Sequence, residues 1–424
     1  MIKFLLSGLL RDRGRSLIPV LVVATGVMLC VLMHAYVTGA MGETIEMNAR
    51  FSTGHVKITT KAYADNIDQV PNDLALLNVS SLMDGLKNNH PQLEWIPRIK
   101  FGGLVDAPDE NGETKAQGPA MGMGLDLLSG QGGENERLKI QESLVRGVMP
   151  AKQGEALLSE KFSQKLKVNP GDAVTLIGST MNGSMTMHNF TVAGTVRFGN
   201  SMLDRGTIIA DIEDVRLALD MYDAAGEIVG YFKTGYYSQE KATGVVEKIN
   251  AEYYDENDEY SPYSLRLRDQ ENMSLFVDMT EYMIWLVTFI FILAMSLVLW
   301  NAGLLGGLRR YGEMGLRLAI GEEKRHVYFT MIAEAVMIGI AGSTMGTVLG
   351  LFFAWLLQTY GIDISSMLEG ASLMMPSRIR AHITPADFYI GFIPGIISTV
   401  IGTALSGIGI YKRKTAQLFK ELEV

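Results

Sequence analysis

Four long uncharged stretches dominate the pattern of hydrophobic and polar positions along the chain. They lack Asp, Glu, Lys and Arg throughout and cover Ser16–Gly42, Tyr282–Leu308, Ala335–Ile362 and Phe388–Tyr411. An α-helix needs about 20 consecutive apolar residues to cross roughly 30 Å of hydrocarbon. The pattern therefore predicts four transmembrane helices, which we place at residues 16–42, 276–308, 327–360 and 388–411.

Between the first two of these helices, the pattern changes to the short periods of mixed helices and strands. Residues 54–60 alternate as a strand does, whereas Leu77, Val79, Leu82 and Leu86 have helical spacing. Strand–helix–strand order is expected near both ends of the region, with a β-rich block inserted between them. We therefore predict a membrane protein whose large α/β domain separates its first two transmembrane helices. The predicted domain covers 43–275, its inserted block about 135–222, a second loop 361–387 and the tail 412–424.

The first fifteen residues carry apolar side chains on one helical face, followed by arginines. This arrangement predicts an interfacial amphipathic helix over 1–15, and the alternative is the frayed beginning of the first transmembrane helix. The uncharged stretch that follows is longer than the 7–15 residues, roughly, of a signal-peptide core, so we expect an uncleaved anchor. The single cysteine, Cys30, excludes an internal disulfide framework, and Leu29 before it is not the small residue that precedes a lipoprotein cysteine.

Charge predicts the orientation of the four helices. The net charge is −9, but Met41–Glu281 is rich in acidic residues while basic residues prevail elsewhere. The basic residues beside the spans lie at Lys3, Arg11, Arg13, Arg15, Arg309, Arg310, Arg317, Lys324, Arg325, Lys412, Arg413, Lys414 and Lys420. By the positive-inside rule, both termini and the segment 309–325 are cytoplasmic and the α/β domain is outside.

The motifs of common catalytic sites are missing from the sequence. It has no phosphate-binding loop, no H-E-x-x-H and no G-x-S-x-G, and its six histidines are scattered. We therefore expect a chain that is not an enzyme, has no cofactor or metal of its own and binds no nucleic acid. Met181, Met185 and Met187 beside His188 could ligate Cu(I). Because methionine more often makes adaptable apolar contacts, we favour a loop that contacts a partner protein.

The segment "RRYGEMGLRLAIGEEKR", residues 309–325, separates the second and third predicted transmembrane helices. Wound as a helix, it has an apolar ridge, a stripe of small residues and a charged ridge. In that order, these are Tyr311, Met314 and Leu318; Gly312, Gly315 and Ala319; and Arg310, Glu313 and Arg317. Such a helix suits a groove on a partner protein. The alternative is a solvated connector whose basic residues only set the topology.

This segment, with the following "MIAEA", resembles the signature of the FtsX-like permeases in the MacB–LolC/LolE group of ABC transporters. The matching positions are Arg310, Glu313, Met314, Gly315, Ala319, Gly321 and, just after them, the carboxylate Glu334. "LLRDRGRSLIPVLVVATGVML" resembles the first span of these permeases. "ALLSEKFSQKLKVNPGDAVTLI" and "FTVAGTVRF" resemble their β-rich Sabre subdomain, which makes the flanking lobe the Porter subdomain. The resemblance covers essentially the whole chain.

Within this group, the long outer domain without a fused ATPase is most similar to the lipoprotein-releasing permeases LolC and LolE. Two departures stand out. The loop "GSTMNGSMTMHN" is shorter than the hook with which LolC engages its chaperone, and the tail "KRKTAQLFKELEV" lacks the usual proline. Docking of a periplasmic chaperone or adaptor is therefore left open.

The resemblance implies a multi-pass protein of the bacterial inner membrane that acts as a dimer with a second copy or a paralogue. An ABC ATPase subunit would bind ATP and magnesium and would contact the segment 309–325, and the cargo would be a lipoprotein or another lipid. The implied ATPase-coupling residues are Arg310, Tyr311, Glu313, Met314, Gly315, Arg317, Leu318, Ala319 and Gly321. The implied cargo entrance consists of Met33, Val37, Met41, Met279, Met283 and Leu286.

An intramembrane carboxylate is functional by default. We interpret Glu334 as a brace for the coupling segment, held by an arginine such as Arg310 or by the N-terminal helix. Two other functions stay open. The chain could drive a tripartite efflux partner, or it could regulate a cell-wall hydrolase and transport nothing.

Overall fold

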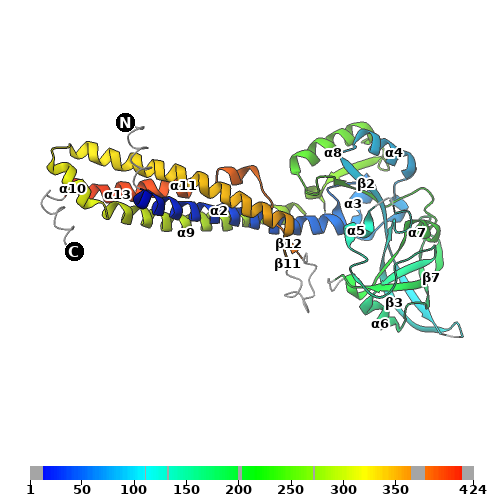
Figure 1. The fold of residues 1–424 in the computed structure, drawn as a ribbon. Helices are drawn as coiled ribbons and strands as arrows, with labels where there is room; N and C mark the ends of the chain where they lie inside the picture. Colours follow the sequence, from blue (N-terminus) through cyan, green and yellow to red (C-terminus); the bar gives the residue numbers. More distant parts are fainter. Residues whose placement is uncertain are drawn as a thin grey trace. The chain divides into compact units, whose positions relative to one another are not determined.

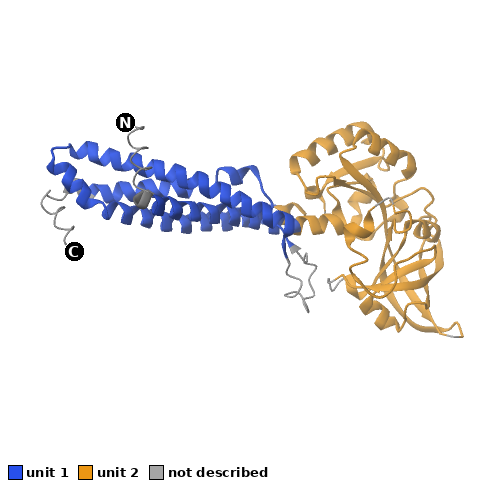
Figure 2. Cartoon of the chain, viewed as in Figure 1, with its two compact units in different colours: residues 1–43, 278–364, 377–424 blue, residues 44–277, 365–376 orange. Residues whose placement is uncertain are grey.

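The computed structural model describes residues 13–109, 111–130, 133–198, 203–270, 273–363 and 378–412. The predicted helix over 1–15 and the tail from 412 fall largely outside these ranges, as does much of the predicted loop 361–387. The chain divides into two compact units (Figure 2). Unit 1 contains 1–43, 278–364 and 377–424, and unit 2 contains 44–277 and 365–376.

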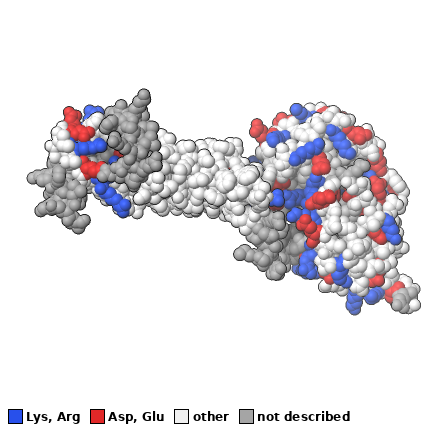
Figure 3. Space-filling model, viewed as in Figure 1, with Lys and Arg blue, Asp and Glu red and all other residues white. Residues whose placement is uncertain are grey.

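Long helices make up unit 1 (Figure 1). Four helical segments are long and apolar enough to cross a membrane, at Leu17–Thr53, Met273–Leu308, Lys324–Tyr360 and Pro385–Ile408, so the four predicted spans are confirmed. The elements are α2 (Arg13–Asn48), α9 (Met273–Leu308), α10 (Tyr311–Ala319), α11 (Lys324–Tyr360), the turns η6 (Pro385–Phe388) and η7 (Ile393–Ser398), α13 (Thr399–Lys412) and the short strands β11 (Ile362–Asp363) and β12 (Arg378–Ile379). On the face in view, the middle of these helices shows no charged side chains, and charge gathers at the end near α10 (Figure 3).

Small residues let α11 approach α2 closely. A Cβ atom added at Gly346 would lie 2.5 Å from the carbonyl oxygen of Ala24, and one at Gly342 would lie 2.7 Å from the side chain of Val23. Gly350 faces Val31 in the same way, at 2.8 Å. Helices in lipid associate by such close packing because the surrounding tails are as apolar as the helices. The spacing of four residues between these glycines therefore defines the α2-facing side of α11.

Unit 2 is built on a ten-stranded sheet with the order β10-β1-β9-β2-β3-β8-β5-β7-β4, and β6 pairs with β2 and β7. Its strands are β1 (Val56–Thr60), β2 (Leu93–Pro108), β3 (Thr114–Leu125), β4 (Leu144–Gly147), β5 (Glu155–Ser159), β6 (Ala173–Ser179), β7 (Met185–Val196), β8 (Thr207–Asp211), β9 (Glu227–Phe232) and β10 (Pro262–Arg266). Its helices are α3 (Lys61–Asp65), α4 (Val79–Asn89), α5 (Glu134–Leu138), α6 (Glu160–Leu166), α7 (Ile212–Leu219) and α8 (Gln239–Tyr253). Single turns lie at Ala49–Thr53, Ile67–Gln69, Asn72–Leu74, Leu203–Arg205 and Leu267–Asp269.

The long strand β2 belongs to two groups of strands. Its first part pairs with β9 from Leu93 to Arg98, and its second part pairs with β3 from Ile99 onward. One group, β1, β9 and β10, comes from both ends of unit 2, with α4 before β2 and α8 after β9, as the strand–helix–strand pattern predicted. The other group begins at Ile99 within β2, earlier than the predicted 135, because Ile99 already pairs with Gly124 in the β2–β3 hairpin.

Buried hydrogen bonds fix the end of α2 and the strands next to it within unit 2. Glu46 lies 2.9 Å from Nε2 of His55, whose Nδ1 accepts a hydrogen bond from the backbone N–H of Phe232. The Tyr231 hydroxyl donates to the carbonyl oxygen of Ala49. These bonds join the last turns of α2 to β9, so this end of the helix belongs to the domain core.

Candidate functional site

Helix α10 lies between α9 and α11 and is shorter than the predicted 309–325. It covers Tyr311–Ala319, and Gly321 after it has a φ of +103°, which only glycine adopts without strain. The backbone N–H of Glu322 then closes the turn on Arg317. The glycine therefore ends the helix, and Glu323 in extended conformation precedes the next one.

The predicted apolar ridge of α10 faces inward. Tyr311 and Met314 are each 4% exposed and pack with Val327 and Met331 of α11, and Leu318 is partly buried against them. The Tyr311 hydroxyl also donates a 2.5 Å hydrogen bond to the carbonyl oxygen of Ser406 in α13. The ridge therefore holds α10 on unit 1, and its two buried side chains do not lie on the surface that meets solvent.

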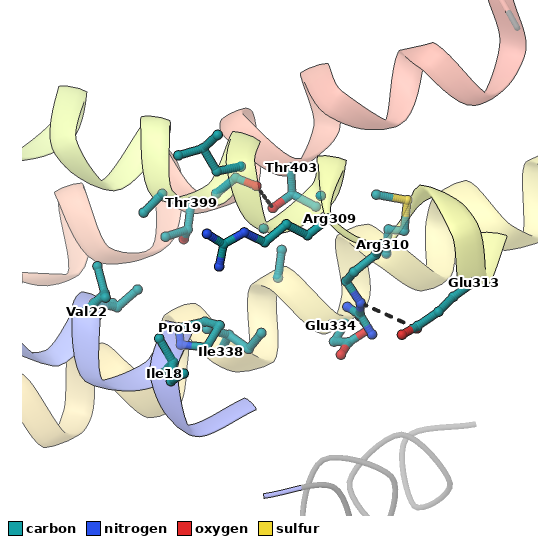
Figure 4. Close-up of a pocket in the computed structure, with 18 residues that line it drawn as sticks. Ile18, Pro19, Val22, Arg309, Arg310, Glu313, Glu334, Ile338, Thr399 and Thr403 are labelled. Atoms are coloured by element: carbon teal, nitrogen blue, oxygen red, sulfur yellow. Dashed lines mark hydrogen bonds and ion pairs between the residues drawn. The ribbon is translucent and has the colours of Figure 1, made fainter. Parts of the chain in front are cut away.

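An ion pair supports α10 from the side. Nη1 of Arg310 lies 2.7 Å from Oε2 of Glu334 on α11, and its Nε lies 3.9 Å from Oε2 of Glu313 (Figure 4). The interpretation of Glu334 as a carboxylate that pairs with Arg310 agrees with this geometry. Arg310 precedes α10, so the pair connects the start of this helix to the third span.

The open side of α10 carries two apolar residues that the sequence interpretation missed. Leu316 is 52% exposed and Ile320 is 79% exposed, four positions apart. Arg317, Ala319 and Gly321, which were predicted to couple, lie exposed beside them. The i, i+4 spacing of Leu316 and Ile320 was a readable signal of a second apolar face. An exposed apolar pair flanked by charges is the kind of surface that protein partners cover.

A cavity of about 530 Å³ opens beside α10 within unit 1 (Figure 4). It lies between α2, α9, α11 and α13, and its charged lining residues are Arg309, Arg310, Glu313 and Glu334. The remaining walls are mainly apolar. Sequence reasoning did not identify this cavity because its lining residues are distant in the sequence.

The predicted cargo-entrance residues differ in exposure. Val37 is only 7% exposed, Met279 is 60% exposed and Met283 is 42% exposed. Met33, Met41 and Leu286 are half-buried. The α9 side of the predicted entrance is therefore open at the surface of unit 1, and Val37 is not.

The methionines of the predicted partner loop also differ in exposure. Met185 and Met187 on β7 are 76% and 67% exposed, whereas Met181 is partly buried against the core of unit 2. Met187 lies opposite Ile177, Ile177 opposite Leu104, and Leu104 opposite Pro119. Side chains opposite each other in a sheet share a face, so these residues form an apolar row across four strands. No cluster of metal-binding side chains occurs among the described residues.

Unit 2 also contains buried charges that the sequence interpretation did not identify. Lys57 and Glu227 are fully buried, with Nζ 2.9 Å from Oε2, and Lys100 approaches the same carboxylate at 3.1 Å. Burial alone would raise the pKa of Glu227, but Lys100, Lys57 and Arg98 outweigh it and hold this pKa at about 2. Arg98, in turn, pairs with buried Glu134 at 2.9 Å. We interpret these pairs as structural because Lys57, Glu227, Arg98 and Glu134 are all buried within unit 2.

Comparisons with known proteins found a similar solved structure and a matching family model. Among solved structures, the periplasmic region of MacB from Actinobacillus actinomycetemcomitans is similar, with 12% sequence identity and a TM-score of 0.36. The match covers 55% of this chain and 95% of that chain. No curated protein matches the sequence. Residues 285–415 match the FtsX-like permease C-terminal family. This range contains α10, the Arg310–Glu334 pair and most of α9, so this part of the chain is similar to FtsX-like permeases, in agreement with the predicted resemblance.

Proposed function

We propose that the chain couples ATP hydrolysis in a separate ATPase subunit to movement of unit 2, and thereby extracts lipoprotein or other lipidic cargo from the outer leaflet of the bacterial inner membrane. In this proposal, both termini and α10 are cytoplasmic, and unit 2 is periplasmic. A second copy or a paralogue completes the transporter. ATP and magnesium bind to the ATPase, and this chain contributes no catalytic group.

The two-sided construction of α10 carries the proposal. Its inner side is fixed by buried Tyr311 and Met314 and by the Arg310–Glu334 pair, while its outer side exposes Leu316 and Ile320. A helix that is held on one side and apolar on the other can transmit a displacement of its partner to α9 and α11. A solvated connector would need neither the buried face nor the exposed apolar pair.

The ATPase contact is tested by adding charge to the exposed pair. We expect Ile320→Asp to reduce co-purification of the ATPase with the tagged full-length chain by tenfold or more, roughly the cost of desolvating an unpaired charge in an interface. Val148→Asp is the matched control, because Val148 is 65% exposed but lies in unit 2. Equal co-purification in the two variants would contradict the assignment of this surface.

The cargo is tested by photo-crosslinking from α9 in cells. Crosslinkers at Met279 and Met283 should capture lipoprotein or lipid when ATP turnover is blocked and lose it during turnover. Val37 is an internal control because its burial leaves little contact with outside molecules. Since an acyl chain in lipid is stabilised by about 0.8 kcal/mol per methylene, its extraction needs an energy source such as ATP. Positions on α9 that capture no lipid in either state would overturn the extraction proposal.

The apolar row on unit 2 supports a second candidate function. Met187, Ile177, Leu104 and Pro119 would form a docking face for a periplasmic partner that receives the motion, such as an efflux adaptor or a cell-wall hydrolase. In that case, crosslinkers at Met185 and Met187 should capture a protein while Met279 and Met283 remain empty. The same experiment therefore separates transport by this chain from mechanical control of a partner.

A further inference from the structure

We propose that the cavity between α2, α9, α11 and α13 binds an anionic phospholipid from the leaflet that borders α10. Arg309 would hold the lipid phosphate, and one acyl chain would lie along the apolar walls. This site is separate from the proposed cargo entrance, because it adjoins the α10 end of α9 rather than the Met279 end.

Arg309 is the charge in this cavity that lacks a counter-ion. No hydrogen bond or ion pair of its guanidinium is found within the part of the chain that the structure describes. Arg310 differs, because it already lies 2.7 Å from Glu334 and 3.9 Å from Glu313. In Figure 4 the Arg309 side chain extends into the cavity toward Val22 and Thr399, away from Glu334.

Arg309 is exposed at the end of a membrane span, where its guanidinium is open to water and to lipid head groups. Arg309 directly follows α9, which ends at Leu308, so its backbone lies where the chain passes from apolar to charged. Charged side chains at this depth pair with an opposite charge or reach toward water. Phosphate groups of lipids are the abundant anions at the edge of the hydrocarbon layer, and basic pockets between spanning helices bind anionic head groups. The position of Arg309 therefore favours a lipid phosphate over a protein carboxylate.

The remaining walls suit an acyl chain. The apolar lining includes Ile18, Val22 and Val23 of α2, Leu305 of α9 and Ile338 of α11. Gly306 borders open space on this side, because a Cβ atom added there would meet no atom within 4 Å. The volume of about 530 Å³ lies within the range of ligand pockets, which is roughly 300–1,000 Å³. A phosphate contact at one end and an apolar channel beside it match the two parts of a phospholipid.

Native mass spectrometry of the full-length chain tests the proposal. The purified chain is titrated with phosphatidylglycerol and, separately, with zwitterionic phosphatidylethanolamine. We expect preferential retention of one phosphatidylglycerol, with an affinity about fivefold lower in Arg309→Gln, the loss expected for one basic residue near a lipid surface. Gly306→Leu should lower this affinity as well, because its side chain occupies the cavity while Arg309 remains. Arg325→Gln is the charge-matched control and should bind as the unchanged protein does.

Three results would overturn the proposal. The first is equal retention of the two lipids, and the second is an equal loss in Arg309→Gln and Arg325→Gln. The third is displacement of phosphatidylglycerol by excess inorganic phosphate, which would indicate a site for a soluble anion. Deletion of residues 2–9 adds a separate check, because lipid retention that rises on deletion would mean that this segment of the chain is the occupant. Melting temperatures of the variants in lipid nanodiscs show whether each has folded.

Discussion

Charged side chains form ion pairs in both units, but the pairs differ in how deeply they are buried. In unit 1, Glu334 is 20% exposed and pairs with Arg310, which joins α11 to the start of α10. In unit 2, Glu227 and Lys57 are fully buried. A buried pair contributes little over an apolar pair of the same shape, but the loss of one partner leaves an uncompensated charge. Substitution of one member of each pair therefore gives measurable but different outcomes.

Glu334→Gln tests the connection between α10 and α11. We expect the variant to keep its ATPase partner and much of the ATPase rate, since Leu316 and Ile320 are untouched, but to lose cargo release because the load on α10 no longer reaches α11. Its free energy of unfolding in nanodiscs should fall by about 1–3 kcal/mol. Release assays and ATPase assays on the same preparation give the amount of cargo released per ATP hydrolysed. A value equal to that of the unchanged protein would show that Glu334 does not couple α10 to α11. Glu322→Gln, on the turn after α10, is the matched control.

Glu227 makes the stability of unit 2 dependent on pH. Its pKa is about 2 in the folded protein and near 4.5 when unfolded. Because the folded value is the lower one, the carboxylate contributes full stability above about pH 4.5, and this contribution is lost as the pH falls toward 2. The difference corresponds to about 3 kcal/mol. Hydrogen exchange of the β9 amides in the full-length chain should show faster opening below pH 4.5.

Glu227→Gln should remove that part of the pH dependence and should be less stable at pH 7, because Lys57 would be left buried without its carboxylate. Glu213→Gln is the control, since the Glu213 side chain is 58% exposed. A pH profile of β9 exchange that is unchanged in Glu227→Gln would show that other groups cause the acid sensitivity.

At the scale of elements, the sequence predicted local structure better than it predicted contacts between distant segments. The four spans follow from uninterrupted apolar stretches, which are a strong local signal. The spacing of Tyr311, Met314 and Leu318 also predicted an apolar helical face. It could not show that α11 and α13 of the same chain cover this face. The sequence interpretation therefore placed these residues toward a partner, and it missed Leu316 and Ile320. The pairs Arg98–Glu134 and Lys57–Glu227 could not be predicted from the sequence, because no periodic pattern relates the positions of the two partners.

The packing of α11 on α2 gives a prediction at this scale. Gly346→Val would place a side chain against the backbone of α2, where an added Cβ already lies 2.5 Å from the carbonyl oxygen of Ala24. We expect the free energy of unfolding to fall by about 1–3 kcal/mol, as at other overpacked sites. Ala341→Val, at an exposed position of the same helix, should change stability little. Thermal unfolding in nanodiscs compares the two, and equal melting temperatures would mean that α2 and α11 separate readily.

At the scale of the whole molecule, the chain passes between its two units inside helices. Unit 2 begins at Thr44, within α2, and ends at Val277, within α9. Neither helix is interrupted at that point, although Gly42 of α2 lies next to it. The ends of both helices are built into unit 2, through Glu46 and His55 for α2 and through the burial of Met273 and Val277 for α9. In the proposed function, a displacement of the spans would be passed to unit 2 through the backbone of these two helices.

Insertion of two glycines after Glu43 tests this transmission. Two extra residues rotate the following helix by about 200°, and each glycine costs roughly 1 kcal/mol of helix stability. We expect the variant to assemble with its ATPase and hydrolyse ATP, because α10 is unchanged, but to release no cargo. The same insertion after Gly112, in the exposed turn between β2 and β3, should leave release intact. If both insertions release cargo equally, α2 does not carry the motion, and transmission through α9 alone would have to be sufficient for transport.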